Sequence, residues 1–303
     1  MTHRPASPIE LQMATGSEPG SMVTKRASRR KAADPAVSPQ RAAKPRPRGS
    51  TLSVTVATQR SGTKLLGNCL NAGVKVRSLG EVFHQEASPV YAFGSYLTRQ
   101  PTLTQDFALG RTWELLDRYT LELSAIAPYV HFDLMYGNLS YLAPLWLSRS
   151  SGLPMLDYLM SRSVGIVHLT RDPADTYISG IVARCTTIYH SSVDVGAVAT
   201  EVSDSDIRQA MLAEPFSAYL EQTLRSREAV RQTLVGYPYA LELDYQGLVD
   251  RDGFLTRGAR EQLATVLTNG DDPRWLQVAP TSMRRPQVDD SIYERVRERL
   301  ERT

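Results

Sequence analysis

The chain has 303 residues, of which 42% are hydrophobic and 22% charged, values that are ordinary for a soluble globular protein of one sizeable domain or two small ones. No apolar run has the length of a signal peptide's central region or of a membrane-spanning helix, so we expect a cytoplasmic protein without a transmembrane segment. The two cysteines, Cys69 and Cys185, match neither a metal-binding spacing nor a disulfide framework, which favours buried thiols.

Residues 1–50 carry most of the positive charge. Ten Lys/Arg side chains accompany three acidic ones in this segment, a local net charge of +7 within a total of +3, which leaves −4 for the rest of the chain. The segment is rich in proline and almost lacks large apolar residues, so it cannot bury enough surface to offset the entropy of ordering. We expect a disordered basic tail over 1–50, with no specific nucleic-acid partner, and a folded domain over 51–303.

Strands and helices alternate from residue 51 onward. Short apolar stretches predict strands at 52–58, 74–78, 130–135, 166–170 and 239–243. Helical spacing predicts helices at 64–72, 104–124, 138–148, 173–187, 206–234 and 257–268, and a charged helix at 292–300. The polar stretch 191–205 is either a lid over a site or a plain connection. The alternation predicts an α/β fold in which helices cover both faces of a parallel sheet.

The first candidate site is the loop in ATQRSGTKLL, residues 57–66, which joins a strand to a helix. It resembles a Walker A P-loop, but Ala57 replaces the first glycine and the final pair is inverted to Thr63-Lys64. Backbone N–H groups at a helix start, the close approach that Gly62 permits, the hydroxyls of Ser61 and Thr63 and the charge of Arg60 together form an anion cradle. An ordinary strand-to-helix turn is the alternative interpretation.

A second candidate anion site lies in GIVHLTRDPADTYISGIVAR, residues 165–184. A strand ends near Arg171, and Pro173 fits the first position of the following helix because its φ is fixed and it lacks an N–H. Ser179 follows Arg171 by eight residues, about two helical turns, so both side chains could hold one phosphate. Taken alone, an Arg before Asp-Pro is usually a surface turn and a mid-helix Ser has no special role.

Together the two motifs resemble those of the sulfotransferase superfamily that uses 3′-phosphoadenosine 5′-phosphosulfate (PAPS). ATQRSGTKLL is similar to the family's 5′-phosphosulfate loop and RDPADTYIS to its 3′-phosphate motif. The resemblance implies a sulfotransferase-like three-layer sandwich over 51–303, PAPS as co-substrate, adenosine 3′,5′-bisphosphate as product and no metal. It places Arg60, Ser61, Gly62, Thr63, Lys64, Arg171 and Ser179 around the co-substrate, and it adds Arg284 and Arg285 of a late basic loop.

Within the superfamily, AGVKVRSLGEVFH, residues 72–84, is similar to a segment of the bacterial carbohydrate sulfotransferases that act on trehalose or nodulation factors. The resemblance implies that Glu81 is the general base and that Arg60 stabilises the leaving phosphate. His84 and His131 are rival bases because imidazole titrates in the useful range. The family commonly has Lys where this chain has Asp133, and a small or hydroxyl residue where it has Lys64.

These features predict transfer of a sulfuryl group from PAPS to a hydroxyl of a carbohydrate, glycolipid or secondary metabolite. A non-catalytic nucleotide-binding module and a P-loop kinase or NTPase are the alternatives. The kinase is disfavoured because Lys64 follows Thr63 and because no strand ends in a clear acidic metal site. The sequence leaves the small-molecule or glycan acceptor unidentified, and it is compatible with a homo-oligomer.

Overall fold

Five parallel strands form the centre of the described chain. The computed structural model describes residues 51–84, 90–101, 105–106, 111–140, 152–186, 202–250, 254–277 and 290–302, all within one compact unit, Gln40–Thr303. The strands are β1 (Leu52–Ala57), β2 (Val76–Ser78), β3 (Tyr129–Met135), β4 (Gly165–Thr170) and β5 (Ala240–Asp244). Their order in the sheet is β2-β3-β1-β4-β5, and every pairing is parallel. The predicted α/β fold with a parallel sheet is confirmed.

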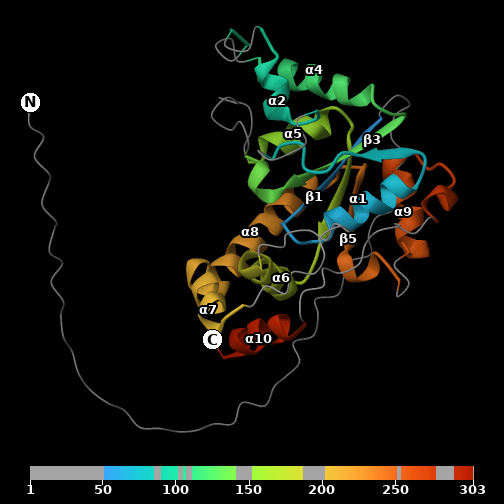
Figure 1. The fold of residues 1–303 in the computed structure, drawn as a ribbon. Coiled ribbons are helices and arrows are strands. Elements are labelled where there is room, and N and C mark those ends of the chain that lie inside the picture. The colour runs from blue at the N-terminus through green and yellow to red at the C-terminus, as the bar shows by residue number, and fades with distance from the viewer. Residues whose placement is uncertain are drawn as a thin grey trace, which may run out of the picture. The chain divides into compact units, whose positions relative to one another are not determined.

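Helices cover both faces of this sheet (Figure 1). The described helices are α1 (Thr63–Ala72), α2 (Phe93–Thr98), α4 (Thr112–Ser124), α5 (Pro154–Ser161), α6 (Pro173–Thr186), α7 (Asp204–Ala213), α8 (Phe216–Leu234), α9 (Arg257–Leu267) and α10 (Asp290–Glu301). Short 3-10 turns occur at η1 (Tyr136–Asn138), η3 (Tyr245–Gly247) and η4 (Pro273–Leu276). None of these helices combines the length and the apolar character needed to cross a membrane.

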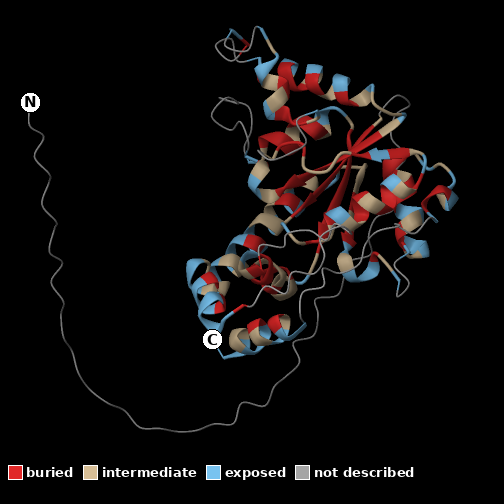
Figure 2. Cartoon of the chain, in the orientation of Figure 1, coloured by how far each residue is buried: buried red, intermediate tan, exposed pale blue. Residues whose placement is uncertain are grey.

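Two apolar cores hold the layers together, one on each face of the sheet. Val54, Val56 and Phe132 face α2, α4 and α5. Ala57 and Val167 face α1 and α9. Figure 2 shows the central strands β1, β3 and β4 as almost completely buried. The arrangement is consistent with a three-layer sandwich.

A third, smaller core joins α6, α7 and α10. Ile178 and Val182 of α6 pack with Ile207 of α7 and Val296 of α10. The guanidinium of Arg295 in α10 bonds to the Asp204 carboxylate at the start of α7. The C-terminal helix therefore holds α6 and α7 in place from the outside.

Most predicted elements occur within one or two residues of their expected bounds. One exception is the predicted helix 104–124, because α4 begins only at Thr112. Another is the predicted helix 206–234, which is two helices, α7 and α8, separated by Glu214 and Pro215. Proline lacks the N–H that would continue α7, so the single-helix prediction was wrong. The short helices α2 and α5 were not predicted. The expected tail 1–50 and most of the stretches 138–148 and 191–205 lie outside the described residues.

The two cysteines differ in burial. Cys69 in α1 is 1% exposed, and burial raises the pKa of its thiol to about 11. Cys185 in α6 is only half-buried, which corrects the expectation that both thiols are buried. Both are free thiols.

Candidate active site

The loop between β1 and α1 has an unusual backbone. Arg60 and Gly62 both have positive φ, 68° and 95°, on either side of Ser61. When residues with positive and negative φ alternate, successive backbone N–H groups point into one concavity. Such a concavity, called a nest, binds anions. The N-terminus of α1 has no side-chain cap and no acidic residue in its first turn. Its N–H groups and the positive end of the helix dipole are therefore left for an external partner.

Some side chains of this loop are placed so that they could bind an anion. Ser61 is fully buried, and its Oγ has no hydrogen-bond partner within the described chain. Thr63 is 8% exposed, Arg60 is half-buried and Lys64 is exposed. A buried hydroxyl without a hydrogen-bond partner costs free energy unless a ligand supplies the missing hydrogen bond. The loop residues thus fit a phosphate or phosphosulfate group, with Lys64 the least enclosed of them.

Glycine is required at position 62. A Cβ atom there would lie 2.4 Å from two ring carbons of Tyr245, the first residue of η3. The positive φ of Gly62 adds backbone strain to any side chain. The Tyr245 ring therefore packs directly against the loop and fixes its position.

Arg171, from the second motif, contacts the same loop. Its Nη1 donates to the carbonyl oxygen of Arg60 at 3.0 Å, and its guanidinium lies 4.5 Å from the centre of the Tyr245 ring. Its Nε is buried without an acceptor. The two motifs, 111 residues apart in sequence, thus meet at one place.

Arg227 of α8 is a further cation that sequence reasoning missed. Its Nη2 donates to the carbonyl oxygen of Arg171 at 2.6 Å, and its Nε is buried without an acceptor. Within the described chain, neither Arg171 nor Arg227 forms an ion pair with a carboxylate. Two guanidinium groups held by carbonyl oxygens leave the local positive charge uncompensated, which favours an anionic ligand nearby.

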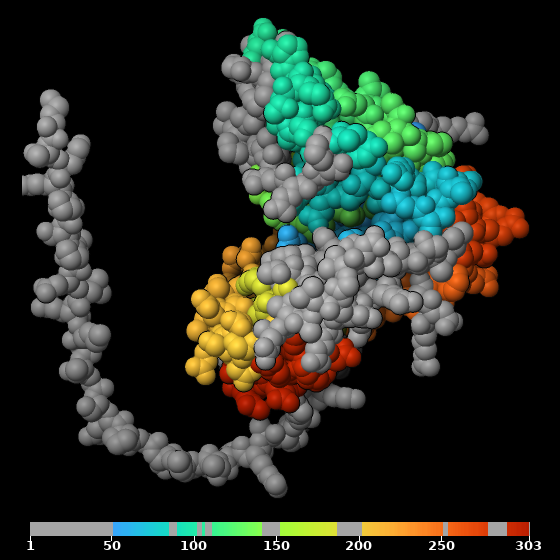
Figure 3. Space-filling view, viewed as in Figure 1, coloured from blue at the N-terminus to red at the C-terminus, as the bar shows by residue number. Residues whose placement is uncertain are grey.

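A cavity of about 470 Å³ opens beside the loop, at the carboxyl ends of β1 and β3. In Figure 3 a notch in the surface separates the teal and green α2 and α4 from the yellow and orange α7 and α8. Most of the described residues that line it carry a polar or charged group, although apolar atoms form nearly half of the lining surface; the lining residues are Thr58, Gln59, Arg60, Glu81, His84, Met135, Tyr136, Gly137, Asn138, Thr176, Tyr177, Gly180, Arg184, Glu214, Tyr219, Gln222, Thr223 and Ser226. Such a lining suits a ligand with many hydroxyl groups.

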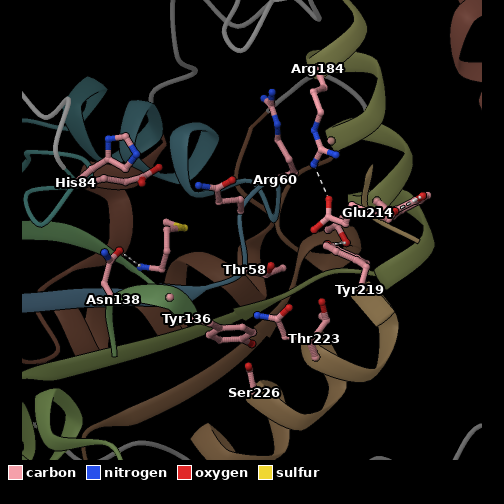
Figure 4. Close-up of a pocket in the computed structure, with 18 residues that line it drawn as sticks. Thr58, Arg60, His84, Tyr136, Asn138, Arg184, Glu214, Tyr219, Thr223 and Ser226 are labelled. Carbon is pink, nitrogen blue, oxygen red and sulfur yellow. Dashed lines mark hydrogen bonds and ion pairs between the residues drawn. The ribbon is translucent and has the colours of Figure 1, made fainter. Parts of the chain in front are cut away.

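The three predicted catalytic residues all line this cavity. Arg60 lines it from the β1–α1 loop, and Glu81 and His84 line it from the segment after β2. Figure 4 labels Arg60 and His84. Burial raises the pKa of the Glu81 carboxyl, whereas the nearby His84 and Arg60 act in the opposite direction. A half-buried carboxylate with a raised pKa is a competent proton acceptor near neutral pH.

His131, the other rival base, does not reach the cavity. It is completely buried in β3, with Nδ1 3.0 Å from Ser53 Oγ and Nε2 2.8 Å from Thr55 Oγ1. Both ring nitrogens are engaged inside the protein. The structure therefore gives His131 a packing role, and His84 is the rival base that remains.

A chain of polar side chains extends from the cavity lining into the protein, and its contact between His168 and Glu242 is too long for a hydrogen bond. Tyr136, which lines the cavity, bonds through its hydroxyl to His168 Nε2 at 2.7 Å. His168 Nδ1 lies 3.8 Å from Glu242 Oε2, and Glu242 in turn accepts from Arg231 of α8. Burial raises the pKa of Tyr136 to about 12 and lowers that of His168. This chain fixes the orientation of Tyr136, and the sequence analysis did not identify it.

Helices α6 and α8 form the opposite wall. Arg184 of α6 bonds to the carboxylate of Glu214 across the cavity rim, the dashed contact in Figure 4. Tyr219 of α8 donates its hydroxyl to Thr176 Oγ1 at 2.7 Å. These contacts tie α6 and α8 into one wall, because each links a residue of α6 to a residue in or just before α8.

The structure gives less support to the other residues that were predicted to bind the co-substrate. Ser179 is half-buried on α6, but it does not line the cavity. Arg284 and Arg285 lie outside the described residues. Within the described chain, no three His, Cys, Asp or Glu side chains gather as a metal site.

No protein-family model fits the chain, and no curated protein is similar to it. The function is therefore inferred from the geometry of the site and from the motifs.

Proposed function

We propose that this chain is a PAPS-dependent sulfotransferase that acts on a hydroxyl group of a carbohydrate or a similarly polar acceptor. The observation that carries the proposal is the contact between Arg171 and the carbonyl of Arg60, which joins the two anion motifs. PAPS has two separated anionic groups, so it needs two neighbouring cationic sites. The loop with Ser61 is suited to one group, and Arg171 with Ser179 to the other.

The cavity beside the loop supports a polar acceptor. Most of the described residues that line it carry a hydrogen-bonding group, and Met135 is the one aliphatic side chain among them. Tyrosine, serine, threonine and amide groups offer hydrogen bonds to several hydroxyl groups at once. A carbohydrate or glycolipid headgroup meets this description better than an aromatic phenol does.

The chain's own residues supply charge and a proton acceptor. When bound, PAPS provides an activated sulfuryl group; transfer forms an oxygen–sulfur bond to the acceptor and breaks the one to phosphate. Glu81 is positioned in the cavity wall to take the acceptor's proton. Arg60 remains charged at every physiological pH, so it stabilises the negative charge that builds on the departing phosphate.

Thermal-shift titration tests the binding step. Adenosine 3′,5′-bisphosphate should raise the melting temperature of the wild-type protein, and Arg60→Ala should reduce that shift. Arg225→Ala, which removes an exposed arginine of α8, serves as the matched control. Stabilisation by magnesium-ATP without stabilisation by the bisphosphate would overturn the proposal in favour of a kinase.

Sulfuryl transfer is tested with a labelled donor. Host extracts incubated with PAPS carrying ³⁵S should yield a labelled polar product, and Glu81→Gln should lower its rate of formation by roughly 10²–10⁴-fold. If Glu81→Gln binds the bisphosphate normally and transfers sulfate at the wild-type rate, the assignment of the base is wrong. A protein that binds the bisphosphate but transfers to no acceptor would support the non-catalytic alternative.

A further inference from the structure

Asp133 is a buried carboxyl group just below the edge of the cavity. It lies in β3 two residues before Met135, so both side chains leave the same face of the strand, and Met135 lines the cavity. Asp133 is 4% exposed. Its Oδ1 has no hydrogen-bond partner in the described chain. A carboxylate in such a place would be strongly disfavoured, whereas a protonated carboxyl would not.

Among the described residues, no cation near Asp133 compensates for a negative charge on its carboxyl group. The closest basic nitrogen is Nε2 of His131, 3.7 Å from Oδ1, and this nitrogen is already bonded to Thr55. Helix α1 covers this face of the sheet, and its buried positions hold no charged side chain. The other ionisable group that acts on Asp133 is Glu81.

Glu81 and Asp133 are held close by the backbone. The N–H of Asp133 donates to the carbonyl oxygen of Gly80 at 2.8 Å, and Glu81 is the next residue. Burial first, and the charge of Glu81 second, raise the pKa of Asp133 from its ordinary value of 3.8 to about 7. Glu81 differs because it faces the cavity and has Arg60 and His84 beside it.

We propose that Glu81 and Asp133 form a carboxyl pair in which the buried Asp133 keeps its proton up to about neutral pH and thereby leaves Glu81 ionised as the base. Like charges at close range cannot both ionise cheaply, so the better-solvated member of the pair carries the charge. Asp133 is a positioning residue, since it acts through Glu81 and does not line the cavity. The role of Glu81 as base rests on the proposed function.

The pair predicts an alkaline limit to activity. As pH rises above neutrality, Asp133 loses its proton and adds a second negative charge beside Glu81. That charge opposes the binding of an anionic donor near Arg60. Asp133→Asn, which imitates the protonated side chain, should keep the activity of the wild-type protein at pH 6.5 and retain it at pH 8.5, where the wild-type protein declines.

A test that needs no acceptor measures stability against pH. The folded-state pKa of Asp133 is raised, so its contribution to stability is present below pH 3.8 and is lost as pH rises to about 7. Asp133→Asn should therefore gain stability relative to the wild-type protein over this range, by up to about tenfold in the unfolding equilibrium constant per pH unit. Urea unfolding at pH 4, 5, 6, 7 and 8 gives this difference.

Asp106→Asn is the matched control. Asp106 is equally buried, at 3% exposure, but it is ion-paired with Arg118, so this variant should lose stability at neutral pH. A difference between Asp133→Asn and the wild-type protein that stays constant from pH 4 to pH 8 would overturn the proposal. Carboxyl ¹³C NMR offers a second measurement, in which Glu81→Gln should lower the titration midpoint of Asp133; an unchanged midpoint would also overturn the pairing.

The two proposals fail separately. The stability and NMR measurements use the protein alone, so they report on the carboxyl pair whether or not PAPS binds. If Asp133 titrates well above its ordinary pKa but the protein has no transferase activity, the carboxyl pair is supported and the proposed function is rejected. If the protein has transferase activity but Asp133 titrates near its ordinary pKa, the proposed function is supported and the carboxyl pair is rejected.

Discussion

The two faces of the central strands β1 and β3 are built from opposite kinds of residue. Toward α4 and α5 the strands present Val54, Val56, Phe132 and Leu134, all within one apolar core. Toward α1 they present Ser53, Thr55, His131 and Asp133, all less than 5% exposed. Apolar burial stabilises the first face in proportion to its area, whereas the second face is stable only if its polar atoms find partners.

This difference separates stability from function within a single pair of strands. The polar face leads from Ser53 and His131 up to Asp133, next to the cavity wall. Among the described residues, the apolar face carries no group that reaches the cavity until Thr58 and Tyr136 at its upper end. We therefore expect substitutions on the apolar face to act on folding, and those on the polar face to act on both folding and chemistry.

The largest expected effect is on the apolar face. Phe132→Ala should destabilise the protein by about 3–5 kcal/mol, because Phe132 is 1% exposed and packs 6.0 Å from the ring of Phe83. Urea denaturation measures the loss. Leu121→Ala on α4, where the side chain is 73% exposed, should change stability by less than about 0.5 kcal/mol. Comparable losses in the two variants would contradict the assignment of the core.

On the polar face, a substitution that barely changes the side-chain volume should still destabilise the protein. Thr55→Val removes the hydroxyl that lies 2.8 Å from His131 Nε2, and with it this buried hydrogen bond. We expect a loss of about 1–3 kcal/mol in the free energy of unfolding. A stabilised Thr55→Val protein would show that this hydrogen bond does not contribute.

A substitution in the β1–α1 loop should lower the affinity for the ligand. Gly62→Ala forces a Cβ atom toward the Tyr245 ring at a strained φ, so the loop must move. The affinity for adenosine 3′,5′-bisphosphate should fall at least about tenfold, or 1.4 kcal/mol, in a calorimetric titration. Gly94→Ala, at a helical position with open space around it, is the control that should bind normally.

The smallest effect is expected at the cavity end of the apolar face. Tyr136→Phe removes the hydroxyl that bonds to His168, for a loss of about 1 kcal/mol in unfolding free energy. Tyr129→Phe breaks a hydrogen bond of 3.5 Å to the Thr268 carbonyl and should lose less. If the second variant loses more than the first, the chain from Tyr136 to Glu242 does not contribute as described.

The sequence predicted the sheet well because its strands are short apolar runs that end in turn residues. Leu52–Ala57 and Gly165–Thr170 are fully buried, and burial on both faces selects continuous apolar stretches. The loop with Gly62 and the segment with Arg171 were also identified, and the structure brings them together. The helix break at Pro215 was visible in the sequence as well, yet the apolar periodicity on both sides of it concealed the break.

The chain from Tyr136 to Glu242 could not be found in this way. Its members come from three separate segments of the sequence, and only the parallel sheet makes them neighbours. One signal was available, because His168 interrupts an apolar strand and a buried polar side chain requires a partner. The same reasoning applies to His131 and Asp133 in β3, but the sequence alone does not say which partner each would find.

The order of the strands also constrains how the chain folds during synthesis. β1 lies in the middle of the sheet, but its two neighbours are β3 and β4, which pair with it from residues 130 and 165 onward. A ribosome must therefore deliver residues up to about Thr170 before the first strand has a partner on each side. Until then at least one edge of β1 has unpaired backbone N–H and C=O groups that could pair with another chain, which makes this interval the one in which newly made protein is most prone to aggregate.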